Sequence, residues 1–427
     1  MKNILIIGGG AGGLPLATYL GKKLGKKGLA KITLVDSNHS HIWKPRFHEV
    51  ATGSLDSDLD SVSYRAHSGI NHYEFEQGTL TSIDRESKTV QLAAIIDEQG
   101  ETILPQRSLA YDYLCLTIGS RSNDFGVKGV QENCCFLDSS EQADRFRTRF
   151  LNACLKTNHS KQPLSISILG GGATGVELAA EIHHAVDMLK LYGHGELDRS
   201  LLNVQLIEAG PRILPALKER ISYSAHEQLE SMGVKVHTGT AVTSVGHDGF
   251  HIKDGSVIGG DILVWAAGIL APKFLSEIEG LESNRINQLL VKPTLQTTND
   301  DTIFALGDCC SCMGDDGKPI APRAQAAQQM AKQTATNLVN LIKGKPLEDF
   351  HYDDKGSLVS LSKFASVGYM MGSLRGSNFF VEGWLARIMY IGLYRFHQAA
   401  LYGWPKTILL LMAGRFNRLV RPRLKLH

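Results

Sequence analysis

Two glycine-rich segments constrain the fold of this chain more than any other feature. The first is Gly8-Gly9-Gly10-Ala11-Gly12-Gly13, and the second is Gly170-Gly171-Gly172-Ala173-Thr174-Gly175. Each comes after a short apolar run and precedes a stretch with helical character. In a G-x-G-x-x-G motif one glycine makes the tight turn, one lets the backbone approach a pyrophosphate, and one lets helix pack on strand. Each segment therefore predicts a strand, a turn and a helix N-terminus that binds the phosphates of a dinucleotide.

Each glycine motif is succeeded by a second apolar strand that ends in an acid. These acids are Asp36 and Glu208. At this position in a dinucleotide-binding unit, a carboxylate binds ribose hydroxyls. The spacing from Gly175 to Glu208 exceeds the usual ~20 residues, which weakens the second assignment. One chain with two dinucleotide sites most economically passes electrons from one dinucleotide to the other.

Length and composition place the chain among ordinary globular proteins. It has 427 residues, 43% of them apolar and 21% charged, with a net charge of +2. This length fits roughly two or three domains. The seven cysteines show no framework spacing, which favours reduced intracellular thiols. No leader precedes the strand that begins at Lys2, so we expect the protein to face the cytoplasm.

The order of the predicted elements indicates an α/β protein in which the second dinucleotide unit is inserted into the first. The strand at 262–269 mirrors the strand at 111–120, and a return strand delivers Asp308 to its end. We expect the first unit over 1–160 and 291–345, the inserted unit over 161–290, and a different C-terminal region over 346–427.

This arrangement resembles the flavin-dependent pyridine-nucleotide oxidoreductases. The resemblance implies one non-covalent FAD on the first unit and NADH as the substrate of the inserted unit. It assigns Gly8, Gly10, Gly13 and Asp36 to FAD, with Asp308 on its ribityl or pyrophosphate part, and Gly170, Gly172, Gly175 and Glu208 to the nicotinamide cofactor. The other residues expected to contact a cofactor are Gly9, Ala11, Gly12, Lys44, Pro45, Leu80, Gly119, Gly268 and Gly307.

Glu208 also bears on the choice between NADH and NADPH. A carboxylate welcomes a 2′-hydroxyl and repels a 2′-phosphate, which favours NADH. Arg212, four residues further on, is available to accept a phosphate, so NADPH stays an alternative.

Two segments beyond the first unit bear on the route by which electrons leave the flavin. Disulfide reductases of this superfamily carry a C-x-x-x-x-C pair just beyond that unit, whereas the segment 43–49 has no cysteine. Residues 324–329 instead read A-Q-A-A-Q-Q. This segment resembles the quinone motif of type II NADH:quinone oxidoreductases, the single-subunit NADH dehydrogenases of bacterial respiratory chains. Gln325 and Gln329 are four residues apart and share a helix face, which leaves a polar structural face as the alternative.

Glu177 lies in the first turn of the helix after the second glycine motif. A structural interpretation makes it an acid stabilised by the helix dipole. The resemblance to type II enzymes instead implies a catalytic acid–base group near the nicotinamide, flavin and quinone sites. We favour the second interpretation.

Three cysteines cluster at Cys309, Cys310 and Cys312. Thiolates suit soft ions such as Cu(I) or Zn. Three cysteines within four residues do not converge easily on one metal, and the sequence offers no obvious fourth ligand. We therefore expect free thiols and no metal site.

The C-terminal region is basic, aromatic and apolar. No acid comes after Glu382, and the basic residues are Arg387, Arg395, Lys406, Arg415, Arg418, Arg421, Arg423 and Lys425. The apolar run at 408–413 is far shorter than the ~20 residues that span a bilayer. These features predict amphipathic helices on an anionic lipid surface. A buried helix with a nucleic-acid-binding tail is the alternative, and we expect no nucleic acid.

Together these observations predict an enzyme that transfers electrons from NADH through FAD to a membrane quinone without pumping protons. We expect it at the cytoplasmic face of the bacterial inner membrane, and homodimerisation is implied by the resemblance only. One alternative is a sulfide:quinone oxidoreductase, which needs redox cysteines such as Cys115, Cys154 or Cys309. Another is a membrane scaffold that senses nicotinamide without turnover.

Overall fold

The computed structural model describes the chain except for residues 193–196, 198, 362–364, 372–377, 421–423 and 426–427. Two compact units are formed. Unit 1 contains residues 1–43, 61–121 and 269–353, and unit 2 contains residues 44–60, 122–268 and 354–427. The expected insertion is therefore present, because 122–268 interrupts unit 1. The sequence analysis expected the inserted segment over 161–290, whereas the long segment of unit 2 runs from Ser122 to Gly268, and unit 2 also contains residues 44–60 and 354–427.

Unit 1 is built on a six-stranded sheet with the order β21-β22-β11-β1-β2-β5. All neighbours are parallel except β21 and β22. The strands are β1 (Lys2–Ile7), β2 (Ala30–Asp36), β5 (Glu74–Gln77), β11 (Tyr113–Leu116), β21 (Gln296–Thr297) and β22 (Asp300–Ala305). The strands β1 and β2 read as apolar runs because their side chains are buried on both faces. The carboxyl ends of these parallel strands place the first glycine motif, Gly119 and Gly307 at one edge.

The helices of unit 1 cover this sheet. Helix α1 (Gly13–Lys23) begins at the end of the first glycine motif and packs against α9 (Ala324–Ile342), which carries the two expected quinone-site glutamines. Shorter helices are η1 (Gly25–Lys27), α4 (Tyr64–Asn71), η4 (Lys273–Glu277) and η5 (Gly307–Cys309). Small sheets are made by β6 (Leu80–Asp84), β7 (Thr89–Leu92) and β10 (Arg107–Ala110), by β8 (Ile95–Ile96) and β9 (Thr102–Leu104), by β3 (Ser40–His41) and β4 (Val62–Ser63), and by β20 (Leu289–Leu290) and β23 (Cys310–Ser311).

Unit 2 repeats the plan with a five-stranded parallel sheet, ordered β12-β19-β13-β14-β15. The strands are β12 (Cys134–Cys135), β13 (Leu164–Leu169), β14 (Leu202–Ile207), β15 (Lys235–His237) and β19 (Ile262–Trp265). A second small sheet contains β16 (Val242–Gly246), β17 (Gly249–Ile252) and β18 (Val257–Ile258). Trp265 and Phe250 belong to a core cluster that joins the two sheets.

Helix α7 (Ala173–Leu191) begins within the second glycine motif and is buried along most of its length. Its neighbour α2 (Phe47–Thr52) also packs on α6 (Ser140–Ser160). The remaining helices of this part of unit 2 are η2 (Lys44–Arg46), α3 (Ser57–Asp60), α5 (Val130–Asn133), η3 (Arg199–Leu201) and α8 (Glu219–Ser231).

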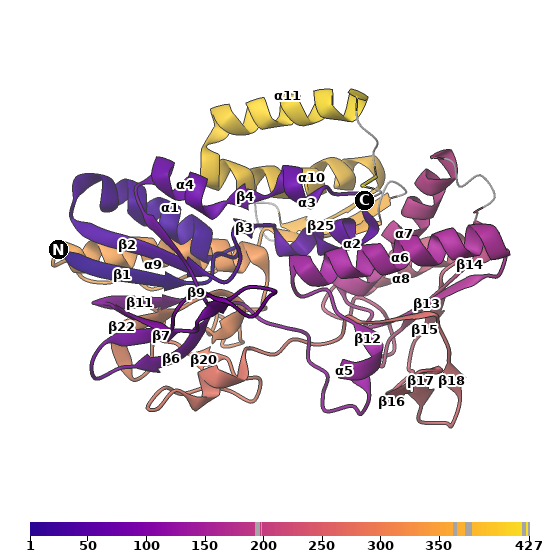
Figure 1. The fold of residues 1–427 in the computed structure, drawn as a ribbon, viewed down its shortest axis with the longest axis horizontal. Helices are drawn as coiled ribbons and strands as arrows, with labels where there is room; N and C mark the ends of the chain where they lie inside the picture. Colours follow the sequence, from indigo (N-terminus) through magenta and orange to yellow (C-terminus); the bar gives the residue numbers. More distant parts are fainter. Residues whose placement is uncertain (193–196, 198, 362–364, 372–377, 421–423, 426–427) are drawn as a thin grey trace. The chain divides into compact units, whose positions relative to one another are not determined.

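The C-terminal part of unit 2 contains strands as well as the expected helices. Strands β24 (Gly356–Leu361), β25 (Ala365–Met371) and β26 (Asn378–Glu382) form an antiparallel sheet. Helix α10 (Gly383–Tyr402) packs on this sheet, and α11 (Trp404–Val420) packs on α10 (Figure 1). No helix among the described residues is long and apolar enough to cross a membrane. The expected basic residues Arg421 and Arg423 lie outside the described part of the chain.

Candidate active site

The first glycine motif in unit 1 forms an open cradle at the start of α1. Gly8 has a φ of +101°, which favours glycine, and a Cβ at Gly13 would collide with the Gly8 carbonyl oxygen. A Cβ at Gly10, by contrast, would meet nothing within 4 Å. No side chain among the described residues caps the N-terminus of α1. An uncapped helix end facing open space fits a pyrophosphate.

Asp36 is tied to this cradle by backbone hydrogen bonds. Its Oδ2 accepts from the Gly9 amide at 2.6 Å, and its Oδ1 accepts from the Asn38 amide at 2.8 Å. Burial raises the pKa of Asp36, although these hydrogen bonds oppose the shift. The Tyr64 hydroxyl donates to the Gly9 carbonyl oxygen at 2.9 Å and fixes the loop from the other side. The carboxylate is therefore held at the mouth of the cradle, where a ribose is expected.

The second motif in unit 2 has the same construction. Gly170 has a φ of +118°, and a Cβ at Gly175 would collide with the Gly170 carbonyl oxygen. A Cβ at Gly172 would meet nothing within 4 Å, and no described side chain caps α7. Each predicted motif thus forms an open glycine loop at a helix N-terminus that no described side chain caps.

Glu208 occupies the place that Asp36 has in unit 1. Its Oε2 accepts from the Gly171 amide at 2.8 Å, and its Oε1 accepts from the Gly210 amide at 2.7 Å. The long spacing from Gly175 therefore does not displace this acid from the loop. The Arg212 guanidinium donates to three backbone carbonyl oxygens, those of Leu214, Pro215 and Leu217.

The remaining residues expected to contact FAD fall into two groups. Asp308 accepts from the Ser120 hydroxyl at 2.9 Å, and Gly119 and Gly307 have φ values of +70° and +76° at the ends of β11 and β22. These residues, with the motif residues Ala11 and Gly12 and the buried Leu80 at the start of β6, all lie in unit 1. Lys44 and Pro45 lie in η2 of unit 2, where the Lys44 Nζ is 3.5 Å from Asp138 Oδ1. Gly268, with a φ of +65°, also belongs to unit 2.

Glu177 is buried, with 6% of the residue exposed, in the first turns of α7. Its Oε1 accepts from the Ser360 amide on β24 at 3.0 Å, and its Oε2 lies 3.5 Å from His48 Nδ1 on α2. Burial raises the pKa of Glu177 to about 8, with smaller upward contributions from Glu49 and Glu181. The side chain is therefore a neutral acid at neutral pH that can donate a proton.

The two glutamines on α9 have different surroundings. Gln329 forms a pair of hydrogen bonds with the Asp353 backbone: its Nε2 donates to the carbonyl oxygen at 2.8 Å, and its Oε1 accepts from the amide at 3.0 Å. Gln325 is half-buried in the first turn of α9. Gln329 thus has a structural role. To bind a quinone as predicted, its amide must give up the hydrogen bonds to the Asp353 backbone.

All seven cysteines are free thiols, without disulfides. Cys115, Cys154 and Cys309, the residues a sulfide oxidase would need, are buried, and burial raises their thiol pKa values. The described residues contain no group of three or more His, Cys, Asp or Glu that could hold a metal.

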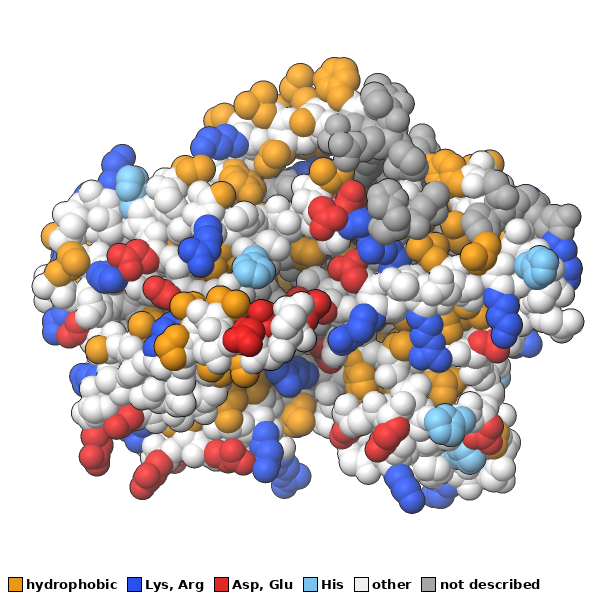
Figure 2. Space-filling view, viewed as in Figure 1, with side chains coloured by type: hydrophobic (Ala, Val, Ile, Leu, Met, Phe, Trp, Pro, Cys, Tyr) orange, Lys and Arg blue, Asp and Glu red, His pale blue; other side chains and the backbone are white. Residues whose placement is uncertain are grey.

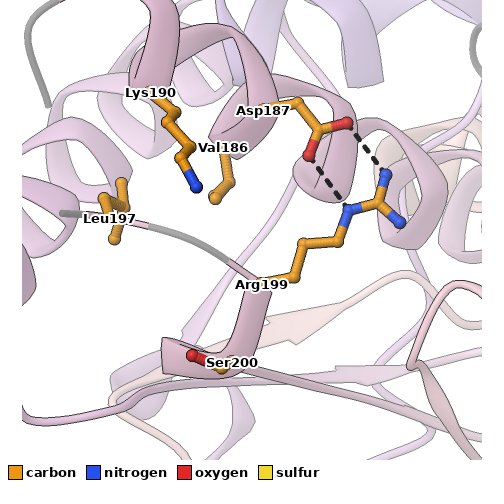
Figure 3. Close-up of a pocket in the computed structure, with 6 residues that line it drawn as sticks. All are labelled: Val186, Asp187, Lys190, Leu197, Arg199 and Ser200. Atoms are coloured by element: carbon orange, nitrogen blue, oxygen red, sulfur yellow. Dashed lines mark hydrogen bonds and ion pairs between the residues drawn. The ribbon is translucent and has the colours of Figure 1, made fainter. Parts of the chain in front are cut away.

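A surface pocket of about 420 Å³ lies at the opposite end of α7 from Glu177. Figure 3 shows that its charged side chains face each other: Arg199 Nη2 donates to Asp187 Oδ2 at 2.8 Å, and Nε donates to Oδ1 at 3.0 Å. Asp187 is ten residues beyond Glu177, or about 15 Å along a helix axis. The pocket is therefore separate from the glycine cradle.

Helix α11 exposes apolar side chains almost all round. Figure 2 shows hydrophobic side chains gathered over this helix. Those at least 40% exposed are Trp404, Ile408, Leu409, Leu410, Leu411, Met412 and Phe416, and Lys406 and Arg415 are exposed with them. A helix with this composition is normally buried, so α11 presents an interaction surface.

Comparison with known proteins assigns the family. Residues 2–331 match the pyridine nucleotide-disulphide oxidoreductase family. A type II NADH:quinone oxidoreductase from Haemophilus influenzae is 48% identical over 444 aligned residues, which cover 100% of both chains. The chain belongs to the type II NADH:quinone oxidoreductases. This membership confirms the family expected from the sequence.

The fold is shared with solved structures at lower identity. The NDH2 of Plasmodium falciparum in complex with NADH is 20% identical with a TM-score of 0.82, and the match covers 99% of this chain and 100% of that one. The sulfide:quinone oxidoreductase of Aquifex aeolicus is 18% identical with a TM-score of 0.74, covering 94% and 92%. The α/β fold with two dinucleotide-binding plans is confirmed.

The residues that contact Glu177 and the first glycine loop were not predicted from the sequence. His48 lies in the segment 43–49, whose one noted property is its lack of cysteine, and Tyr64 and Tyr390 belong to no motif. The one available signal for His48 is its position in a Phe-His-Glu run of a buried helix.

Proposed function

We propose that this type II NADH:quinone oxidoreductase binds FAD on the cradle of unit 1 and NADH on the cradle of unit 2. The observation that carries the assignment is the pair of matched cradles, each with an open glycine and an acid tied to the loop. Bound FAD would accept two electrons from NADH and pass them on to a quinone. Gly10 and Gly172 are the positions at which the backbone lies open to phosphates.

The enzyme prefers NADH to NADPH. Glu208 points its carboxylate at the second cradle, where it binds a 2′-hydroxyl and repels a 2′-phosphate. Arg212, the nearest candidate for a phosphate, is engaged with three backbone carbonyl oxygens, which supports this preference.

Glu177 supplies a proton to the quinone during its reduction, and Gln325 and Gln329 bind the quinone. A buried neutral carboxylic acid is suited to general acid catalysis near neutral pH.

The exposed apolar helix α11 docks on a lipid surface at the cytoplasmic face of the bacterial inner membrane. Its apolar side chains insert at the interface, while Lys406 and Arg415 are attracted to anionic headgroups. A quinone with a long tail is dissolved in the same lipid, so this docking brings enzyme and substrate together. Assembly as a homodimer is an expectation from the family resemblance.

The deciding experiment is steady-state NADH oxidation by the FAD-loaded protein with a quinone acceptor. We expect NADH oxidation that depends on quinone. Bleaching of the flavin by sulfide without NADH would favour a sulfide oxidase, although the buried thiols argue against that chemistry. Nicotinamide binding without turnover would indicate a sensor and would contradict the proposal.

A further inference from the structure

His48 lies between two carboxylates, one at each ring nitrogen. Its Nδ1 is 3.5 Å from Glu177 Oε2, and its Nε2 is 4.0 Å from Glu49 Oε1. The residue is 3% exposed on helix α2, which packs on α7 within unit 2 (Figure 1). A neutral imidazole has one donor and one acceptor nitrogen, so it can receive a proton on one side and release it on the other.

The carboxylate on the Nε2 side is paired with a guanidinium. Arg46 Nε donates to Glu49 Oε1 at 2.9 Å, and its Nη2 donates to the other oxygen. The guanidinium lies 4.5 Å from the centre of the Tyr394 ring, which holds it from the far side. Burial alone lowers the pKa of Arg46, but the charge and hydrogen bonds of Glu49 outweigh it and raise the pKa above its ordinary value. The Glu49 carboxylate, which lies 4.0 Å from His48 Nε2, is therefore placed to stabilise a positive charge on His48.

The carboxyl group on the Nδ1 side is a neutral acid at neutral pH, because burial raises the pKa of Glu177 to about 8. Burial also lowers the pKa of His48 to about 4, in spite of the opposing charge of Glu49. At pH 7 the proton of the pair is therefore on Glu177, and His48 Nδ1 is the alternative place for it. The two placements differ only by transfer across the 3.5 Å contact.

Other charged and titratable groups lie on the elements packed around the pair. Helix α6, which packs on α2, carries the buried Arg147, whose Nη1 lies 2.7 Å from Asp144 Oδ1. Helix α7 contributes Glu181, and α10 contributes Tyr390 and Tyr394; the nearest part of β24 contributes only the Ser360 amide. The buried Tyr390 hydroxyl faces Glu177: its hydrogen bonding opposes the rise in the Glu177 pKa, and the Glu177 charge in turn raises the pKa of Tyr390. Asp60 adds to the negative charge around Arg46. Within this surrounding, His48 is the base that faces the Glu177 carboxyl group directly.

We propose that His48 is the proton partner of Glu177 and returns a proton to it after each quinone reduction. The inference rests on the proposed function, in which NADH, quinone and one proton give NAD⁺ and quinol. The Glu177 O–H bond breaks as an O–H bond forms on the quinone oxygen. His48, which carries its proton on Nε2, takes a proton from solvent at Nδ1, and Glu49 on the Nε2 side stabilises the resulting positive charge. The Nδ1–H bond then breaks as the Glu177 O–H bond re-forms, and His48 is neutral again with its Nε2 proton in place. His48 is thus a positioning residue that acts through Glu177.

The kinetic test uses His48→Asn in the FAD-loaded protein. The Asn amide nitrogen takes about the place of Nδ1 and keeps a polar contact with Glu177, but it does not titrate. We expect flavin reoxidation by quinone to slow by about 100-fold, the size typical of lost proton transfer, while flavin reduction by NADH is unchanged. The pH dependence of the quinone half-reaction should also change.

His183→Asn is the matched control. His183 is as buried as His48 and lies on α7, but both its ring nitrogens lack hydrogen-bond partners among the described residues. We expect its two half-reactions and their pH profiles to match the wild type. An unchanged quinone half-reaction in His48→Asn, or an equal loss in His183→Asn, would overturn the proposal.

A second readout does not depend on turnover. Histidines are labelled with a nitrogen isotope, and the resonance absent from His48→Asn is assigned to His48. In the wild type we expect this resonance to move as the pH passes through about 8, because Glu177 titrates there. In Glu177→Gln it should stay still over that range. A resonance that stays still in the wild type, or that moves equally in both, would overturn the pairing.

These two measurements separate the inference from the proposed function. A wild type that reduces no quinone contradicts the function, and the magnetic-resonance titration still decides whether the pair shares a proton. If the wild type is fully active and His48→Asn reoxidises its flavin with quinone as fast as the wild type, only the inference about His48 is contradicted. If His48→Asn fails to fold, a histidine resonance that moves near pH 8 in the wild type and stays still in Glu177→Gln identifies the partner of Glu177, and the absence of any such resonance overturns the pairing.

Discussion

Asp36 and Glu208 show how a single carboxylate serves both a loop and a ligand. Each carboxylate accepts hydrogen bonds from two backbone amides, which leaves further lone pairs for ribose hydroxyls. One of the two amides belongs to Gly9 in unit 1 and to Gly171 in unit 2, the residue between the first two glycines of each G-x-G-x-x-G motif. The acid at the end of the second strand therefore holds the cradle in shape before any cofactor binds.

The change Glu208→Gln should reduce the preference for NADH over NADPH. The amide keeps the size of the side chain but removes the charge that repels a 2′-phosphate, and it weakens the bond to a ribose hydroxyl. A charge-assisted hydrogen bond contributes about 1.5–3 kcal/mol, so the ratio of kcat/KM for the two cofactors should fall by about 10- to 100-fold. The KM for NADH should rise in steady-state assays.

Glu230→Gln is a suitable comparison, because this acid is exposed on α8 and has no contact with the glycine motif. It should leave the cofactor ratio as in the wild type. If Glu208→Gln also left the ratio of kcat/KM for NADH and NADPH unchanged, the assignment of Glu208 to the ribose site would be wrong.

Glu177→Gln should make the protein more stable toward alkaline pH. The folded protein keeps a proton on Glu177 up to about pH 8, whereas an unfolded glutamic acid loses it near 4.5. Between these values the folded state binds more protons, so the free energy of unfolding falls as the pH rises, by about 1.4 kcal/mol per pH unit. A glutamine removes this slope, which denaturant titrations of the holoenzyme can measure.

The titration of His48 sets the lower limit of the pH range for this measurement. Because burial lowers the pKa of His48 from 6.5 to about 4, its contribution to stability is lost as the pH falls through that range. Above pH 6.5 this contribution is constant, and the slope of Glu177 stands alone up to about pH 8. Parallel pH profiles of wild type and Glu177→Gln in this window would show that Glu177 is ionised in the folded protein.

At the scale of elements, helix α9 carries the two glutamines that we propose bind the quinone, and one of them also stabilises the fold. Gln329 ties the helix to the Asp353 backbone, while Gln325 lies one turn earlier, next to the start of the helix. The sequence placed both on one face correctly, because their spacing of four residues fixes that. It could not show that the amide of Gln329 is already engaged, since its partner lies 24 residues away.

Gln325→Ala and Gln329→Ala should both slow flavin reoxidation by quinone and leave flavin reduction by NADH almost intact. Loss of one hydrogen bond to a quinone oxygen corresponds to about a 10-fold slower half-reaction. Stopped-flow absorbance of the flavin separates the two half-reactions. Gln329→Ala should in addition lower the free energy of unfolding by about 1–2 kcal/mol, since two bonds to Asp353 are lost.

Gln333→Ala provides the control for the helix itself. Gln333 is one further turn along α9 and binds the Glu348 carbonyl oxygen. Its loss should affect stability alone. If Gln329→Ala behaved like Gln333→Ala, with no selective effect on the quinone half-reaction, the role of Gln329 would be only structural.

At the scale of the whole chain, the sequence was informative where the backbone itself carries the chemistry. The glycine motifs and their acids predicted two cradles because turn geometry and strand ends depend on local residues. The partners of Glu177 were not predictable in this way. His48 and Ser360 lie far from it along the chain and meet it only through packing of α2 and β24 on α7. The sheet β24–β26 was likewise absent from the prediction, because helical and aromatic composition dominated that region.

The C-terminal helices allow a sharper test of membrane docking than deletion of residues 384–427. Such a deletion would remove Tyr394, which contacts Arg46, and Lys425, which lies 3.2 Å from Asp56. It would therefore disturb unit 2 as well as the exposed surface. The triple change Leu409→Ser, Met412→Ser and Phe416→Ser alters only side chains that are at least 54% exposed.

This triple variant should lose binding to lipid vesicles while it keeps FAD and reduces small soluble acceptors with NADH. Full burial of one large apolar side chain contributes about 1.5–3 kcal/mol, so even partial insertion of three predicts a loss of at least about 10-fold in vesicle binding. Reduction of a long-tailed quinone in vesicles should fall with it. High salt should release the wild type only in part, because screening weakens the attraction of Lys406 and Arg415 to anionic lipid but leaves apolar insertion.

Vesicle flotation measures the binding, with flavin content and gel filtration as checks on folding. Ile103→Ser is the matched control, since Ile103 is 59% exposed on β9 of unit 1 and should not affect flotation. A triple variant that still floats would show that α11 does not insert. Complete release of the wild type by salt would show that the attachment is electrostatic, and the exposed apolar side chains of α11 would then need another partner.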